Sequence, residues 1–265
     1  MNDRSRKKQQ VKAIIISSYG GPEVLTATEL PDPVPADSEV LIAVKAFGLN
    51  HAEAYMRSGA FGEVAKVTGI ECAGTVVADP SGRLAAGTTV VAILGGMGRT
   101  RNGSYAELVT VPASNVVEVS TSLPWTDLVA LPEVYSTAWA GLRQNLDLRP
   151  GQTVLIRGAT SALGQAAVNV AAEQGADVIA TTRNPDRAAL LERIGAKTVL
   201  IDDGRLFLNP PPPPHKADHW PAIGTVMAQL RARFPDTYIG YWNDVIIRVP
   251  RGMGPAIEEF MKVHH

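Results

Sequence analysis

Cysteine is almost absent from this chain of 265 residues, and its single cysteine, Cys72, excludes an internal disulfide and is typical of a reducing compartment such as the cytoplasm. Long apolar runs are also missing, since no segment approaches the roughly twenty apolar residues that a membrane helix needs. The formal net charge of −1 offers no broad field that would attract nucleic acid or a lipid surface. With 45% hydrophobic and 19% charged residues, the composition predicts a soluble globular protein with a buried core.

The first ten residues, 1–10, contain four basic side chains but lack the apolar centre of a secretory signal. We expect a disordered leader there, and a basic targeting tail is the alternative. The sequence that can form a packed core begins at Val11.

The stretch from Thr153 to Gly164 predicts a buried strand, a tight turn and the start of a helix. Its apolar run is broken by Gly158, and the helix is expected from Ala162 onward. A helix N-terminus offers unpaired amide N–H groups and a positive dipole end, which together bind a diphosphate. The three glycine positions of the dinucleotide fingerprint are occupied here by Ala159, Ser161 and Gly164, so two of them are merely small.

The residues after this turn predict a parallel β-α-β-α-β unit, which is half of a dinucleotide-binding fold. After the first helix, the expected elements are a strand over Asp177 to Thr182, a helix over Arg187 to Ile194 and a strand over Lys197 to Ile201. A nucleotide-free α/β layer is the alternative interpretation of this pattern.

The end of the second strand of this unit favours NADPH as the cofactor. A site for NAD usually carries Asp or Glu there to accept a hydrogen bond from the ribose 2′-hydroxyl, whereas this chain has Thr181, Thr182 and Arg183. A guanidinium can pair bidentately with a 2′-phosphate that a carboxylate would repel. A solvated loop charge is the alternative role for Arg183.

The first 130 residues predict a different kind of domain, because short strands separated by Gly and Pro alternate with almost no helix. We expect a small barrel-like β domain over 11–130, followed by the nucleotide-binding part over 131–206. A helical bridge is predicted between them, from Leu128 to Leu142 with an interruption at Pro132. The expected strands cover Val11 to Ile16, Glu39 to Ala46, Ala73 to Ala78, Thr88 to Leu94, Ser104 to Val111 and Val116 to Val119.

Five ordered motifs over residues 11–205 resemble the medium-chain dehydrogenase/reductase superfamily, and within it the zinc-free quinone oxidoreductase branch. The resemblance implies an α/β chain with a β-rich N-terminal domain: a GroES-like barrel followed by a partial, first-half Rossmann parallel sheet. It also implies NADPH-dependent hydride transfer to a small quinone or enone, and a homodimer formed through the nucleotide domain. The motifs are Gly48 to Gly59, Gly69 to Gly74, Gly103 to Glu107, Leu131 to Trp139 and Gly158 to Gly164.

The same resemblance predicts that no metal is bound. Zinc-dependent members of the superfamily use a Cys and a His where this chain has Asn50 and Ile70, and an isoleucine cannot ligate. His51 and Glu71 are the sequence neighbours of these positions, and a lone histidine is more often hydrogen-bonded or packed than a ligand.

The site residues also follow from the resemblance, which places the Asn and the Tyr of the first motif close to the nicotinamide. We therefore predict catalytic roles for Asn50 and Tyr55: an amide can orient a carboxamide or a water, and a phenol can donate to an enolate. Tyr55 can equally be a buried barrel residue. The predicted cofactor-binding residues are Asn50, Thr137, Gly158, Thr160, Ser161, Ala162, Leu163, Gly164 and Arg183.

The resemblance ends after Leu206, and residues 207–265 are interpreted as a Pro-rich linker with an unmatched tail, so that the chain is a truncated member. Pro210 to Pro214 can form polyproline II and serve as a spacer or as a ligand for proline-binding modules. Without a second half of the sheet, Thr153 to Arg157 becomes an edge strand, which we expect Val245 to Val249 or a second subunit to cover. A catalytically inactive NADPH-binding or protein-interaction remnant is the alternative function.

Overall fold

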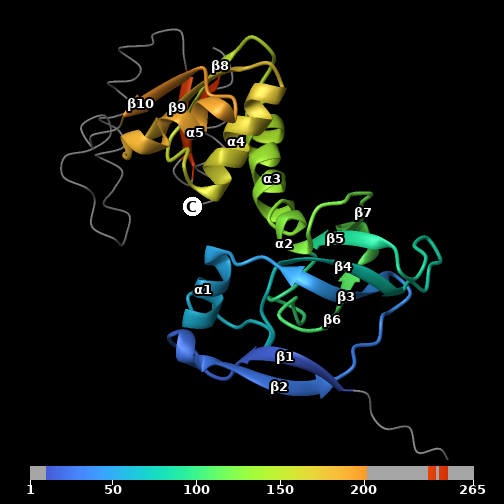
Figure 1. Cartoon of the computed structure of the whole chain (residues 1–265). Helices are drawn as coiled ribbons and strands as arrows, with labels where there is room; N and C mark the ends of the chain where they lie inside the picture. Colours follow the sequence, from blue (N-terminus) through green and yellow to red (C-terminus); the bar gives the residue numbers. More distant parts are fainter. Residues whose placement is uncertain (1–9, 202–237, 243–244, 250–265) are drawn as a thin grey trace, which may run out of the picture. The chain divides into compact units, whose positions relative to one another are not determined.

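The computed structural model describes residues 10–201, 238–242 and 245–249 (Figure 1), and the chain divides between Glu133 and Val134 into two units. The predicted leader, the proline run and the tail helices expected over Ala222 to Phe234 and Pro255 to Val263 lie outside the described residues, although Gln10 already belongs to the first strand.

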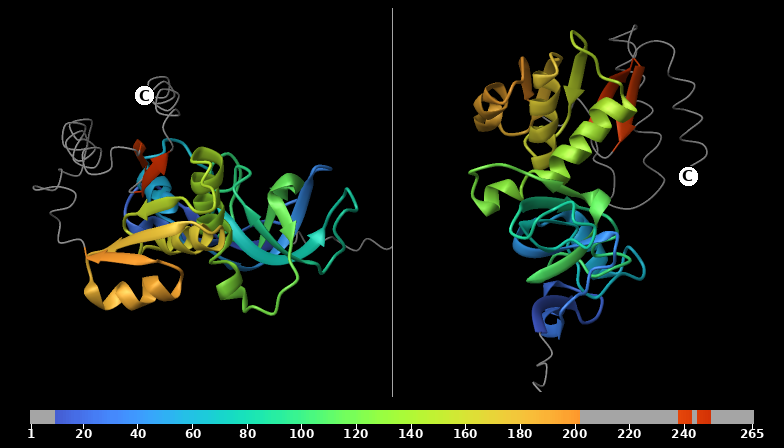
Figure 2. Two further views of the ribbon diagram at one scale, coloured as in Figure 1. Left: turned by 90° about the horizontal axis from the view of Figure 1, so that it is seen from above. Right: turned by 90° about the vertical axis from the view of Figure 1, so that its right-hand side faces the viewer.

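The first unit contains a curled antiparallel sheet of five strands in the order β6-β3-β4-β5-β7 and a separate β1-β2 hairpin (Figures 1 and 2, blue to green). Alternating apolar side chains of these strands point to one side, and Val40, Ile42, Val90 and Val111 are completely buried there. The strands are β1 (Gln10–Ile16), β2 (Leu25–Pro31), β3 (Glu39–Phe47), β4 (Glu71–Ala78), β5 (Thr89–Ile93), β6 (Leu108–Pro112) and β7 (Val116–Glu118).

The near absence of helix predicted for the first 130 residues is wrong, because α1 (His51–Ser58) interrupts the sheet between β3 and β4. Asn50 precedes its first turn, Glu53 follows three residues later, and Gly59 ends the helix with a φ of 84°. These are ordinary helix start and stop signals. The predicted strand over Ser104 to Val111 begins only at Leu108, and β2 was not predicted.

The predicted helical bridge is present as three pieces, α2 (Trp125–Leu128), α3 (Pro132–Trp139) and a π-helical turn over Ala140–Asn145. Pro132 begins α3, which agrees with the interruption expected there, because proline fits the first turn of a helix and lacks the N–H that a helix interior requires.

The second unit contains a three-stranded parallel sheet in the order β10-β9-β8 (Figures 1 and 2, yellow to orange). The apolar side of α4 packs on it, and Val154, Ile156 and Val168 are completely buried. The predicted fold class is confirmed: a GroES-like β domain plus the first half of a Rossmann parallel sheet. The elements are β8 (Thr153–Ile156), α4 (Ala162–Glu173), β9 (Asp177–Thr182), a 3-10 turn (Pro185–Arg187), α5 (Ala188–Arg193) and β10 (Thr198–Ile201).

Two further strands, β11 (Tyr238–Trp242) and β12 (Val245–Val249), form an antiparallel hairpin. The sequence predicts strands with these bounds but not their pairing with each other. β12 lies beside β8. Among the described residues, β8 therefore has β9 as its hydrogen-bonded neighbour on one edge and β12 close to the other.

Candidate functional site

The turn between β8 and α4 has the geometry of a phosphate-binding turn. Gly158 adopts a φ of 63°, which favours glycine, and Ser161 precedes the helix as its N-cap. The Ser161 hydroxyl accepts a hydrogen bond from the amide of Gly164 at 3.0 Å. The amide of Ala159 donates to the carbonyl of Thr181 at 3.1 Å, which fixes this turn against the end of β9.

Gly164 is required by the close approach of α4 to the turn. A Cβ atom at this position would lie 2.4 Å from the carbonyl oxygen of Gly158 and 2.7 Å from the Cα of Ala159. Both are backbone atoms, so neither can move aside as a flexible side chain could. Gly164 therefore has the packing role of the third glycine in the dinucleotide fingerprint.

The N-terminal end of α4, called the mouth of α4 below, is accessible to solvent. Ser161 and Ala162 are exposed, and Leu163 and Thr160 are partly exposed. The first hydrogen bond of the helix joins the amide of Gln165 to the carbonyl of Ser161, and the serine hydroxyl takes the amide of Gly164. Within the described ranges no hydrogen bond reaches the amides of Ala162 and Leu163, which are thus free to bind an anion.

The end of β9 carries a cation and no carboxylate. Thr181 and Thr182 are buried, and the hydroxyl of Thr182 is occupied by the backbone of Asn184. Arg183, which lies between Thr182 and Asn184, is exposed. In the described part of the chain, no ion pair or hydrogen bond holds its guanidinium.

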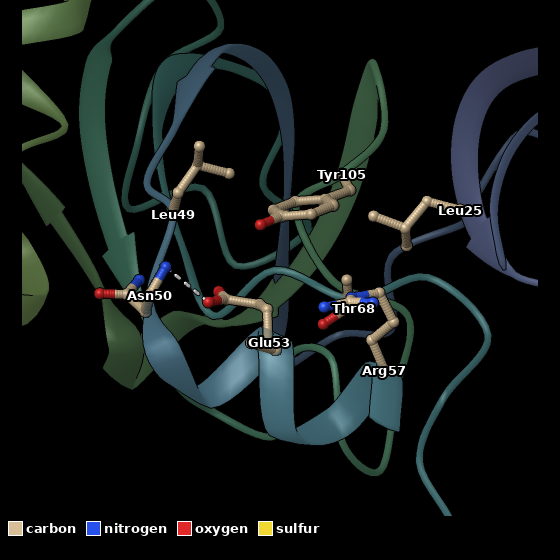
Figure 3. A pocket seen from close by; sticks show the side chains of 8 residues that line it. Leu25, Leu49, Asn50, Glu53, Arg57, Thr68 and Tyr105 are labelled. Atoms are coloured by element: carbon tan, nitrogen blue, oxygen red, sulfur yellow. Dashed lines mark hydrogen bonds between the residues drawn. The ribbon is translucent and has the colours of Figure 1, made fainter. Parts of the chain in front are cut away.

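A second cluster of polar groups lies in the first unit, around the start of α1 (Figure 3). The backbone amide of Asn50 donates to Glu53 Oε2 at 2.7 Å, and the amide of Ile70 donates to Glu53 Oε1 at 3.2 Å. The side-chain amide of Asn50 donates to Glu71 Oε1 at 2.9 Å. Two buried carboxylates therefore hold the residue that the sequence nominated for the nicotinamide side of the site.

Glu71 connects three segments through one carboxylate that is only 3% exposed. Its Oε1 accepts from Asn50, and its Oε2 accepts from the amide of Glu133 in the first turn of α3 at 2.8 Å. A Cβ on Gly48 would lie 1.9 Å from Glu71 Oε1, so the carboxylate occupies the space that a side chain would fill. Burial raises the pKa of Glu71, and the hydrogen bonds from Asn50 and Glu133 partly oppose this rise.

A pocket of about 190 Å³ opens beside Asn50 in the first unit (Figure 3). The side chain of Tyr105 borders it opposite α1, and its hydroxyl is directed toward the space above Asn50 and Glu53. The lining residues are Leu25, Leu49, Asn50, Glu53, Ala54, Arg57, Thr68 and Tyr105.

Tyr55 lies outside this pocket. Its side chain is 56% exposed on α1, with its ring centroid 6.3 Å from that of Phe61, so the alternative of a buried barrel residue is wrong. Thr137 is exposed on α3 in the second unit. The structure thus brings Asn50 to the pocket, and separately brings Gly158, Thr160, Ser161, Ala162, Leu163 and Gly164 together at the mouth of α4.

Comparisons with known proteins agree with this arrangement. Residues 36–121 match the alcohol dehydrogenase GroES-like domain. The chain is 28% identical to human quinone oxidoreductase over 195 residues, which is 71% of this chain and 58% of that protein. It is 32% identical to a quinone oxidoreductase-like protein 2 homolog from Nematostella vectensis over 201 residues, 74% of this chain and 53% of that one. These matches support a medium-chain dehydrogenase/reductase of the quinone oxidoreductase-like kind.

Solved structures of similar proteins cover both units. A quinone oxidoreductase from Pseudomonas syringae matches with a TM-score of 0.65 and 30% identity, over 73% of this chain and 59% of that one. A mycobacterial protein solved in complex with NADPH matches with a TM-score of 0.66 and 28% identity, over 86% and 64%. These similarities confirm the predicted resemblance to the quinone oxidoreductase-like part of the superfamily. The chain spans between 53% and 58% of the length of the two curated relatives named above.

Within residues 10–201 and the two tail strands, no three or more His, Cys, Asp and Glu side chains gather as metal ligands would, and Ile70 is buried at the position discussed above. In the same ranges no helix combines the length and the apolar character that crossing a bilayer requires.

Cys72 is expected to resist alkylation in the folded protein. Its side chain is fully buried, and burial raises the pKa of the thiol to about 12, so at about pH 8 roughly one molecule in 10⁴ carries the reactive thiolate. Iodoacetamide followed by mass spectrometry should leave the native chain unmodified and label it fully in denaturant. Equal rates in the two states would contradict the burial.

Sequence reasoning missed Glu53 and Tyr105 and gave Glu71 only a passing role. The spacing of Asn50 and Glu53 is a capping-box signal that could have identified Glu53. Tyr105 was quoted only as part of the Gly103 to Glu107 motif. Its place beside Asn50 depends on backbone hydrogen bonds that connect distant parts of the chain, including the bond from its amide to the carbonyl of Thr68.

Proposed function

We propose that this chain is an NADPH-dependent, zinc-free oxidoreductase of the quinone or enone reductase type. The observation that carries the proposal is the pairing of free amides at the mouth of α4 with an exposed Arg183 at the end of the neighbouring strand β9. Relatives named quinone oxidoreductase and a similar structure that contains NADPH support it.

The residues of the second unit fit this cofactor. The amides of Ala162 and Leu163 would bind the diphosphate, for which Gly164 allows the close approach of α4, and Arg183 would bind the 2′-phosphate. Thr137 and Asn50 are proposed on the nicotinamide side. When bound, NADPH supplies the hydride that reduces an activated C=C bond or a quinone.

The first unit would supply orientation and a proton. Glu71 and Glu53 hold Asn50, whose carboxamide oxygen would accept a hydrogen bond from a bound carboxamide or water. The exposed phenol of Tyr55 can donate to an oxygen on which negative charge develops during reduction.

Replacement of Arg183 by Ala tests the choice of cofactor. We expect the affinity for NADPH to fall about 10- to 100-fold, because a charge-assisted pair with the 2′-phosphate is lost, and the affinity for NADH to stay the same. Titration of both cofactors by fluorescence or calorimetry measures the ratio. Arg193→Ala, which removes an exposed arginine at the end of α5, is the matched control. An equal loss for both cofactors would contradict the proposed role.

A second candidate function is an inactive NADPH-binding or protein-interaction remnant, in which the free amides of α4 and Arg183 would serve binding alone. Binding of NADPH without turnover of simple quinones and enones would support the remnant. Turnover that is lost in Arg183→Ala with NADPH but retained with NADH would support the enzyme.

The proposal includes the cytoplasm as the compartment, because the single thiol is typical of a reducing environment, and a homodimer as the assembly. Light scattering of the purified chain measures its assembly.

A further inference from the structure

The hydroxyl of Tyr105 is a fixed donor that lacks an acceptor within the described residues. Tyr105 is 6% exposed, and its ring centroid lies 4.4 Å from that of Phe47. Its backbone amide donates a hydrogen bond to the carbonyl of Thr68, and its carbonyl accepts one from the amide of Ile14. None of the hydrogen bonds among the described residues involves its Oη, which is directed into the pocket (Figure 3). Because this hydroxyl faces the pocket, a bound ligand can accept its hydrogen bond in place of solvent.

The polar groups around this donor are already occupied. Both oxygens of Glu53 accept backbone amides, and the hydroxyl of Thr68 donates to the sulfur of Met56 at 3.4 Å. Arg57 donates to the carbonyl of Gly20 at 2.8 Å. Burial and the nearby carboxylates of Glu53 and Glu71 raise the pKa of Tyr105, so the hydroxyl keeps its proton near neutral pH.

The shape and charge of the pocket restrict what can accept this hydrogen bond. The carboxylate of Glu53 and the guanidinium of Arg57 both line the pocket, so the charged side chains of its lining balance and favour a neutral ligand over an ionic one. The side chains of Leu25, Leu49 and Ala54 give an apolar wall. The volume of about 190 Å³ is below the roughly 300–1,000 Å³ of pockets for drug-sized ligands, which favours a single small ring.

We propose that this pocket is a carbonyl subsite, in which a neutral one-ring enone or quinone lies against Leu25 and Leu49 and accepts a hydrogen bond from Tyr105 Oη. This deepens the proposed function, on which it rests for the reaction but not for the binding. The donor stabilises the negative charge that gathers on the carbonyl oxygen when the conjugated C=C bond is reduced.

Binding of 2-cyclohexen-1-one to the full chain without cofactor tests the subsite. Methyl NMR titration should show saturable shifts at Leu25 and Leu49 in the unmodified chain. Tyr105→Phe keeps the ring and removes the hydroxyl, and should weaken binding about tenfold, as expected for one lost hydrogen bond. Tyr19→Phe is the matched control, because the hydroxyl of Tyr19 donates to the exposed carbonyl of Gly62 away from the pocket, and it should bind as the unmodified chain does.

The outcomes separate the two proposals. Absence of shifts at Leu25 and Leu49, or equal affinity in Tyr105→Phe and the unmodified chain, would overturn the subsite, and the leucine shifts remain informative if the variant does not fold. Failure of NADPH to bind would overturn the proposed function and leave the enone titration unchanged. With both ligands bound, Tyr105→Phe should lower kcat/KM for the enone while the affinity for NADPH stays the same.

Discussion

Replacing Glu71 by Gln is expected to lower the free energy of unfolding by about 1–3 kcal/mol, which is typical for a buried donor left without an acceptor. The carboxylate accepts from Asn50 through one oxygen and from the amide of Glu133 through the other. A glutamine of the same shape must turn an NH₂ group toward one of these donors. The amide also removes the charge that burial disfavours, so the measured loss is the net of the two effects. Chemical denaturation measures it.

The loss should depend on pH in a direction that follows from the raised pKa of Glu71. A carboxyl group whose pKa is higher in the folded chain than its usual value of 4.5 contributes its full stability below pH 4.5. This contribution is lost as the pH rises through the pKa of the folded chain. The advantage of the unmodified chain over Glu71→Gln should therefore shrink as the pH rises above about 4.5. A pH-independent difference would show that charge burial at Glu71 contributes nothing.

Two further variants control this prediction. Gly48→Ala places a methyl group where Glu71 Oε1 lies. This variant should reduce both the free energy of unfolding and the rate of quinone turnover. Glu118→Gln neutralises an exposed carboxylate on β7 and should change neither. If Glu71→Gln behaves like Glu118→Gln, the carboxylate does not hold the two segments together.

Gly164→Ala should abolish measurable NADPH binding and destabilise the second unit by about 2 kcal/mol. The added methyl group meets backbone atoms of Gly158 and Ala159 at 2.4–2.9 Å, and such overpacking costs about 1–3 kcal/mol. To relieve it, α4 must shift away from the turn, which displaces the amides of Ala162 and Leu163 from the proposed diphosphate position. Cofactor titration and thermal unfolding measure the two effects.

Gly141→Ala provides the comparison for this variant. Gly141 lies in the π-helical turn after α3, and a Cβ there would have nothing within 4 Å. Alanine should therefore leave the stability unchanged or raise it slightly, because it reduces the freedom of the unfolded chain. Intact NADPH binding in Gly164→Ala would show that the diphosphate does not bind at the mouth of α4.

The parallel sheet could be predicted from the sequence because its signals are local. Val154 and Ile156 form an apolar run, Gly158 breaks it, and glycines end the helices that follow. Each of these features depends on residues a few positions apart, so β9 was predicted with the bounds that the structure has.

The polar cluster could not be predicted in the same way, because it is assembled by tertiary contacts. Residues 50, 71 and 133 meet at one carboxylate although about twenty and sixty residues separate them. The helix α1 was missed because it has only eight residues and few large apolar side chains. Tyr55 was placed near the chemistry by resemblance, and only the structure places its side chain on the exposed side of α1.

The inert, inaccessible thiol at position 72 makes this chain a convenient background for spectroscopy. A cysteine introduced at an exposed site such as Val117 in the first unit, and another at Ile201 in the second, would be the only positions that take up a fluorophore. Energy transfer between two such dyes would then follow the separation of the units in solution as nucleotide is added, without first deleting any native residue.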